Sequence, residues 1–246
     1  PDADVFDGVD TSLRSLLSFS PAAPPALSAG LDRISAAVAD ARMQLASGGE
    51  GAAVGPLTVG LKALRDVRAS LATMNLPEPA RFEIDFRLAQ KEPQFAQALM
   101  LAADVRLDAV ARDGLVVPGQ PLQIDLLANN RGQTAVERVV SASGFTAAAG
   151  CPAITMQPGA SNNCDQKVTI PADARLTAAH FRNGPVGARY VFDPDVPFGL
   201  PFRPTPFTAT FALSVNNTTF TVDLPIQWRS EHDIFAGEKR AEIHVV

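Results

Sequence analysis

Several residue types are scarce in this chain of 246 residues, and each scarcity narrows the choice of function. The sequence has two cysteines, three histidines and one tryptophan. Two thiols are too few for a structural zinc site built from cysteines. The histidines, at 180, 232 and 244, have no His or Cys partner at metal-ligand spacing. We therefore expect no metal and no cofactor in this chain.

Clustered positive charge and long apolar runs are also missing. The net charge is −5, and Lys and Arg are not clustered anywhere in the sequence. Because binding to phosphates needs clustered positive charge, nucleic acid is not expected as a partner. No apolar run approaches the roughly 20 residues that cross a bilayer, so no membrane span is expected. The chain starts at Pro1 without the basic start and apolar core of a signal peptide, which indicates a mature or excised fragment.

Motifs for covalent catalysis are absent as well. No Gly-x-Ser-x-Gly elbow presents a serine nucleophile, and neither cysteine has an activating base nearby in sequence. The glycines at 49, 51 and 55 have the wrong spacing for a dinucleotide loop and follow a helix instead of a strand, so they are interpreted as a plain loop. The sequence therefore offers no recognised motif for a serine or cysteine nucleophile or for dinucleotide binding.

The two cysteines that are present, Cys151 and Cys164, lie 13 residues apart in a stretch rich in Gly, Ser and Asn. Two readings are open: a disulfide, or two free thiols on one loop. The disulfide is favoured because turn-forming residues flank both positions, and closing such a short loop stabilises a fold by roughly 3 kcal/mol. A disulfide implies an oxidising compartment, so we expect an extracytoplasmic location, periplasmic or secreted.

Residues 1–103 have the apolar periodicity of helices. Four helices are predicted: a short one that Asp10 or Thr11 caps, one over 31–45, one from Pro56 to 74, and one over 81–103 that Pro93 should kink. Short loops between them are typical of an antiparallel helical bundle. We expect this part to form a helical subdomain.

From residue 104 onward the apolar period becomes two, as in half-buried strands. Strands are predicted at 105–111, 122–126, 138–144, 165–170, 208–215, 219–227 and 239–246. Asn216 and Asn217 supply a tight hairpin turn. About seven such strands predict an antiparallel sandwich of the immunoglobulin or fibronectin kind over 104–246. The expected fold class is α+β, with a mainly all-β C-terminal part.

One segment, 190–207, fits neither helix nor central strand because it holds five prolines. It is also too apolar for a flexible linker, so we expect an extended crossing that its aromatics pin onto a sheet. Phe198, Phe202, Arg203 and Phe207 could form a surface strip that binds a partner or a sugar, although core packing is favoured. The carboxylates of Asp193 and Asp195 could ligate calcium, but turn residues beside prolines are the favoured interpretation.

Several motifs carry a family resemblance over nearly the whole chain. They are Phe6-Asp-Gly-Val-Asp-Thr-Ser12, Phe82-Glu-Ile-Asp-Phe-Arg-Leu-Ala-Gln-Lys-Glu92 with Gln94-Phe95, Val117-Pro-Gly-Gln120, Phe192-Asp-Pro-Asp-Val-Pro-Phe-Gly-Leu-Pro-Phe-Arg-Pro-Thr-Pro-Phe207 and Gly237-Glu-Lys-Arg240. In this order they resemble the region after the catalytic domain in large bacterial PIG-L family deacetylases. That family includes LmbE-like proteins and the N-acetylglucosaminyl-phosphatidylinositol de-N-acetylases. The 192–207 run is the most specific element.

The resemblance implies a zinc-dependent parent that removes acetyl groups from N-acetylated sugars. Its metal site rests on a His-Pro-Asp-Asp motif and a further histidine, and no histidine here precedes Pro-Asp-Asp. The zinc site is thus expected in an upstream catalytic domain, and the chain is expected to be truncated at both ends. The implied role is a non-catalytic accessory region whose partners are that domain and, through the sandwich, glycoconjugate. The alternatives are an independent secreted carbohydrate-binding or adhesion module and a cryptic hydrolase that uses unpaired carboxylates.

Overall fold

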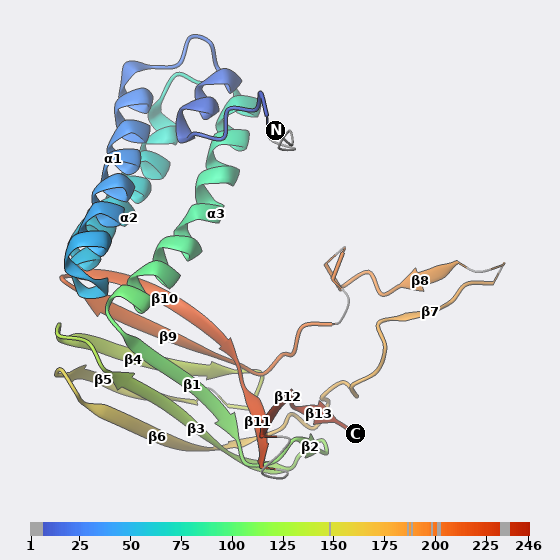
Figure 1. The fold of residues 1–246 in the computed structure, drawn as a ribbon. Helices are drawn as coiled ribbons and strands as arrows, with labels where there is room; N and C mark the ends of the chain where they lie inside the picture. Colours follow the sequence, from blue (N-terminus) through green and yellow to red (C-terminus); the bar gives the residue numbers. More distant parts are fainter. Residues whose placement is uncertain are drawn as a thin grey trace.

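The computed structural model describes residues 7–147, 149–185, 187, 189–197, 199–200, 203–231 and 237–246. Helices form its first part and strands its second (Figure 1). The last helix ends at Ala102 and the first strand starts at Val105. Asp104, between them, has a positive φ of 46°, a backbone state that Asp tolerates better than most residues. The fold is therefore a mixed α+β arrangement in which helices precede sheets.

Among the described residues, the helical part contains three long helices and three short 3-10 segments. They are η1 (Leu13–Phe19), α1 (Pro25–Gly48), η2 (Glu50–Ala53), α2 (Val54–Ser70), η3 (Leu71–Thr73) and α3 (Glu78–Ala102). Pro25 occupies the first turn of α1, where its missing N–H is not needed. Pro93 lies inside α3, and the chain is helical on both sides of this proline. The first predicted helix is present as a 3-10 segment.

Two glycines allow the long helices to approach one another closely. A Cβ atom on Gly30 of α1 would overlap the side chain of Val67 on α2. A Cβ atom on Gly60 of α2 would lie 2.6 Å from Cε1 of Phe95 on α3. Both contacts are closer than side chains tolerate, so glycine is required by packing at these helix crossings.

Two larger sheets form most of the strand part. The five-stranded sheet has the order β12-β11-β1-β3-β6, and the four-stranded sheet has the order β10-β9-β4-β5. Two small sheets, β13-β2 and β7-β8, complete the set. The strands are β1 (Val105–Ala111), β2 (Leu115–Val116), β3 (Pro121–Asn130), β4 (Val136–Ser143), β5 (Ala149–Met156), β6 (Ser161–Thr169), β7 (Phe181–Asn183), β8 (Tyr190–Phe192), β9 (Thr208–Val215), β10 (Thr218–Pro225), β11 (Gln227–Glu231), β12 (Glu238–Glu242) and β13 (His244–Val245).

The sheets differ from the sequence-based expectation in pairing and in number of strands. Most pairs are antiparallel, but β1 pairs with β11 in parallel, and so does β13 with β2. The described residues form thirteen strands, whereas about seven were predicted. The predicted strand 219–227 is two strands, because the chain leaves the four-stranded sheet after Pro225 and enters the five-stranded sheet at Gln227. Ile226, between them, is fully buried.

The helices and the two larger sheets share one hydrophobic core. Strand β4 alternates strictly between buried and exposed residues, and β9 alternates in the same way between buried and half-buried residues. The buried apolar cluster runs without a break from Leu16 in η1 to Val245 in β13. Arg65 on α2 also donates a 2.7 Å hydrogen bond from Nη1 to the Thr219 carbonyl at the start of β10. The helical part is therefore anchored to the end of the four-stranded sheet.

None of the helices that the structure describes is both long and apolar enough to span a membrane.

Candidate interaction surfaces

The segment 171–207 between β6 and β9, which we call the arm, exposes several large apolar side chains, among them Phe181, Tyr190 and Phe192. Among its described residues the strands are β7 and β8, which pair as a two-stranded hairpin with Phe181 opposite Phe192. Figure 1 shows this hairpin extending away from the larger sheets. All six hairpin residues are exposed. An isolated two-stranded hairpin is marginally stable in water, so an arm of this kind fits a surface that meets a partner.

An aromatic cleft of about 570 Å³ lies between the hairpin and the segment 196–200. His180, Phe181, Tyr190, Phe192, Val196, Pro197, Gly199 and Leu200 line it. The imidazole of His180 is buried, whereas Tyr190 is 58% exposed and Phe192 57% exposed. The rings of Phe181 and Tyr190 meet nearly edge to face, with centroids 5.2 Å apart and planes 77° apart. The lining is thus mainly aromatic and aliphatic, and its polar side-chain groups are the imidazole of His180 and the phenol of Tyr190.

Four charged side chains form an ion-pair cluster at the root of the arm, where the residues before the hairpin meet those after it: Arg175, Asp193, Asp195 and Arg203. Arg203 donates 2.6 Å hydrogen bonds to Asp195 Oδ2 from Nη1 and to Asp193 Oδ2 from Nη2. Arg175 also contacts both carboxylates, at 2.7 Å for Asp193 and 3.3 Å for Asp195. The hydrogen bond from Arg203 lowers the pKa of Asp195 below its usual value of 3.8. Each carboxylate is therefore neutralised by arginines, an environment that fits ion pairing and not calcium coordination.

The strip of residues predicted from sequence is split by the structure. Phe207 is buried and its ring stacks on Phe145 with centroids 5.1 Å apart, as the packing interpretation predicts. Arg203 belongs to the ion-pair cluster at the root of the arm. Phe198 and Phe202 lie outside the described residues. Phe207 is therefore not part of an exposed strip, because its side chain fills the core beneath β9.

A second surface runs along α3. Its exposed positions from Phe82 onward are Phe82, Phe86, Gln90, Pro93, Gln94, Gln97 and Leu101. They recur at three- and four-residue steps, so they share one face of the helix, and none is charged. The rings of Phe82 and Phe86 stack with centroids 6.0 Å apart and are 64% and 51% exposed. We call this set the uncharged α3 face.

Charged side chains flank the uncharged α3 face instead of interrupting it. Glu83 pairs with Arg87, and Arg68 of α2 bonds Asp85 at 2.8 Å and Glu92 at 2.7 Å. The Arg87 guanidinium also lies 4.6 Å from the centroid of the Phe19 ring. Because these charges pair along the sides of the helix, the face between them stays apolar and amide-rich. Such a surface is depleted in charge and carries aromatics, as the centre of a protein interface does.

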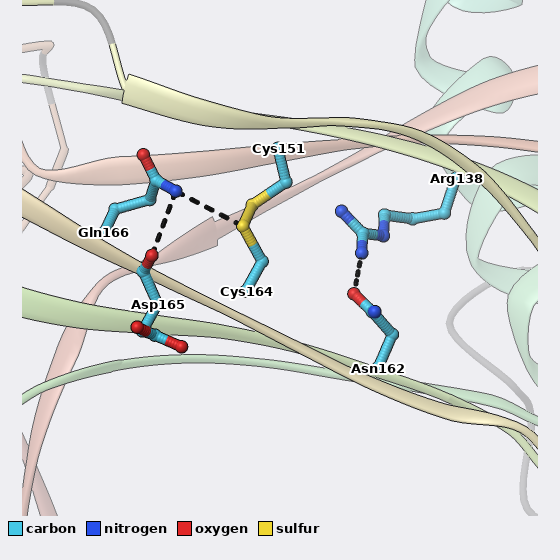
Figure 2. The surroundings of a disulfide bond; sticks show 6 residues. All are labelled: Arg138, Cys151, Asn162, Cys164, Asp165 and Gln166. Atoms are coloured by element: carbon cyan, nitrogen blue, oxygen red, sulfur yellow. Dashed lines mark hydrogen bonds between the residues drawn. A yellow bond between two sulfur atoms is a disulfide. The ribbon is translucent and has the colours of Figure 1, made fainter.

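The cysteine pair forms the expected disulfide, which joins β5 to β6 and thus the edges of the two larger sheets. The Cα atoms are 6.3 Å apart. Figure 2 shows Arg138 and Asn162 beside this bond, with the guanidinium directed toward the Asn162 side chain. Gln166 donates to the Cys164 sulfur at 3.4 Å. The disulfide prediction is confirmed.

The aromatic cleft and the uncharged α3 face were both missed by the sequence reasoning. The spacing that placed Leu88, Phe95 and Leu99 inward also places Phe82 and Phe86 on the opposite side, so the α3 face could have been found. The cleft could not, because it depends on how the chain folds back between Phe181 and Leu200. Within the described residues, no group of three His, Cys, Asp or Glu side chains could hold a metal ion. His232 lies outside them.

Comparison with known proteins yields no family. No family model matches the sequence, and no curated protein matches it. Among solved structures, the sporulation control protein Spo0M from Bacillus subtilis is 12% identical over 52% of this chain and 50% of its own, with a TM-score of 0.27. A FixG-related protein from Vibrio parahaemolyticus is 14% identical over 58% of this chain and 97% of its own, with a TM-score of 0.28.

A third solved structure is the alkylpurine DNA glycosylase AlkC from Pseudomonas fluorescens, bound to DNA with an abasic site analogue. It is 13% identical over 74% of this chain and 47% of its own, with a TM-score of 0.27. The chain spans about half the length of Spo0M and of AlkC. These similarities are too low to carry an argument about function.

Proposed function

We propose that this chain is the non-catalytic accessory region of a bacterial PIG-L-like zinc-dependent N-acetylglucosamine deacetylase. In this role the helical part supports the catalytic domain, and the strand part presents glycoconjugate to it. The zinc belongs to the catalytic domain of the parent protein. The proposal includes a helical bundle over 1–103, an immunoglobulin-like sandwich over 104–246, and an extracytoplasmic location, periplasmic or secreted, consistent with the disulfide.

The observation that carries the proposal is the uncharged α3 face. It extends over five turns of helix and includes two aromatic rings that are more than half exposed. In a free-standing module an exposed face of this length would normally carry charge for solubility. The first part of the face, from Phe82 to Gln94, lies in the segment 82–95, which carries part of the resemblance. A neighbouring domain that covers it would remove both rings from water, with a gain of about 25 cal/mol per Å² of apolar surface buried.

The proposal is tested by producing the upstream catalytic domain of the same reading frame separately and titrating it with this chain. We expect saturable binding, and we expect Phe82→Gln with Phe86→Gln to weaken it at least about tenfold, or about 1.4 kcal/mol. The matched control is Met43→Gln on α1, which replaces another exposed apolar side chain away from this face. The proposal is contradicted if the double variant binds the catalytic domain as tightly as the unsubstituted chain does. A reading frame without a His-Pro-Asp-Asp motif also contradicts it.

The isolated chain should also release no acetate from an N-acetylglucosaminide, with or without added zinc, because the deacetylation site lies in the other domain. The measurement is an acetate assay against a blank that contains zinc alone. Zinc-dependent turnover well above that blank would show that the chain itself is the catalyst.

A second candidate function rests on the aromatic cleft of the arm. An independent secreted carbohydrate-binding or adhesion module would use exposed rings such as Tyr190 and Phe192 to stack against apolar sugar faces. A glycan array with the parent chain and Tyr190→Ala distinguishes this candidate. Binding that disappears in Tyr190→Ala, together with no affinity for the catalytic domain, would favour the module over the accessory region.

A further inference from the structure

The core of the strand part contains a positive charge without an anionic partner. Arg138 on β4 is 1% exposed. Its Nη2 donates to Asn162 Oδ1 on β6, while its Nε and Nη1 are buried and have no hydrogen-bond partner. A guanidinium has five N–H donors, and leaving them unpaired in a low-dielectric interior is unfavourable. Burial accordingly lowers the pKa of Arg138 from its usual value.

The position of Arg138 links this charge to the disulfide. Arg138 and Val140 both lie on the buried side of β4, and Val140 pairs with Cys151 in the β4–β5 ladder. On β6, Asn162 lies two residues from Cys164 and so on the same side of that strand. The Arg138–Asn162 hydrogen bond and the Cys151–Cys164 bond are therefore adjacent connections between the two larger sheets, as Figure 2 shows.

Both connections end on strands at the edges of their sheets or next to an edge. β5 and β6 are the last strands of the four-stranded and five-stranded sheets. They lie next to each other in Figure 1, and the disulfide joins them. Hydration of Arg138 requires these edges to separate and admit water. The disulfide is covalent and opposes that separation, whereas the hydrogen bond to Asn162 satisfies only one nitrogen of the guanidinium.

We propose that the disulfide is a redox latch, and that the buried charge of Arg138 opens the β5–β6 side of the two sheets when the latch is reduced. A dithiol reductant donates two electrons and two protons, the S–S bond breaks, Cys151 and Cys164 become thiols, and the dithiol becomes a disulfide. The edges then separate, water reaches the guanidinium, and the unpaired donors are satisfied. Thiol–disulfide exchange with a disulfide oxidant re-forms the Cys151–Cys164 bond, reduces the oxidant to a dithiol and closes the edge again. Complete folding of the strand part thus depends on an oxidising environment.

The test compares amide hydrogen exchange of the full chain before and after dithiothreitol treatment, with alkylation to confirm two free thiols. In the parent chain, protection in β5 and β6 should fall at least about tenfold on reduction, while β1 and β9, in the sheet interiors, stay protected. In Arg138→Met, which keeps the length of the side chain without its charge, the loss should be less than about threefold. Arg106→Met on the surface of β1 is the matched control and should behave as the parent.

Two results for the parent chain and Arg138→Met overturn the proposal. One is an equal loss of protection in Arg138→Met and in the parent chain, which would make the disulfide a simple tether. The other is full protection of β5 and β6 in reduced parent chain. If Arg138→Met does not fold, Arg138→Leu replaces it. Arg138→Lys, which keeps a charge, should open on reduction as the parent does, and a closed reduced form of that variant also contradicts the proposal.

Discussion

At the scale of single residues, the structure separates side chains that fill the core from side chains that hold the arm in place. Phe207 stacks on Phe145 and is inaccessible to a ligand. Arg203, four residues earlier, instead pairs with Asp193 and Asp195 at the surface. From the sequence alone both residues were candidates for one surface strip, with core packing favoured, because proximity along the chain does not show which side chain turns inward. Of the two carboxylates that bind Arg203, Asp195 has its pKa lowered, mainly by the hydrogen bond from Arg203.

Replacing Arg203 with Gln should raise the pKa of Asp195 toward 3.8, because the hydrogen bond from Arg203 is the largest cause of its lowered value. A carboxylate with a lowered pKa in the folded state stabilises the fold above its unfolded pKa, and this stabilisation is lost as the pH falls through the folded pKa. In the variant, Asp195 should therefore stabilise the fold less at neutral pH, and less stability should be lost through this residue as the pH falls. Carboxyl NMR titration measures it, and Arg229→Gln, whose partner is Glu238, should leave Asp195 unchanged.

At the scale of elements, the hairpin between β9 and β10 shows local sequence deciding local structure. Val215 pairs with Thr218, so Asn216 and Asn217 form a two-residue turn. Their φ values are 50° and 58°, and this turn requires positive φ at both positions. Asn tolerates that backbone state better than most non-glycine residues, so the turn could be predicted from the Asn216–Asn217 pair in the sequence.

Asn217→Val should destabilise the fold by about 1–2 kcal/mol, because a β-branched residue is strained in the left-handed region. Asn217→Gly should be neutral or slightly stabilising, since glycine adopts positive φ freely. Both side chains of the turn are exposed, so neither change removes a core contact. Urea unfolding measures the difference. A valine variant as stable as the glycine variant would show that the turn is not under backbone constraint.

At the scale of the whole molecule, helices and sheets are connected through a continuous core and through Arg65, which bonds both Glu92 on α3 and the Thr219 carbonyl. Strand order could not be read from the sequence. The parallel pairing of β1 with β11 joins residues more than 100 positions apart, and Ile226 carries the chain from one sheet to the other. Because the helices and sheets share this core, we expect the whole chain to unfold cooperatively.

Far-ultraviolet circular dichroism, dominated by the helices, and fluorescence of Trp228 in β11 should report the same urea midpoint. The physical reason is that both parts lose the shared core together, as in a two-state transition. Leu99→Ala in α3 removes a fully buried side chain and should lower both midpoints equally, with a loss of about 2–5 kcal/mol. Separate midpoints for the two signals would show that the helical and strand parts unfold independently.

The sequence by itself determined the positions of the long helices, of β1 and β9, and of the Asn216–Asn217 turn, and it favoured the pairing of Cys151 with Cys164 over two free thiols. Each depends on short-range rules: apolar period, turn chemistry or loop closure. It did not determine β5, which contains Gly150 and Pro152, or the split of the predicted strand 219–227 between two sheets. Only the tertiary structure decided the burial of Arg138 and the aromatic cleft. These depend on which distant segments pack together, and local pattern does not encode that choice.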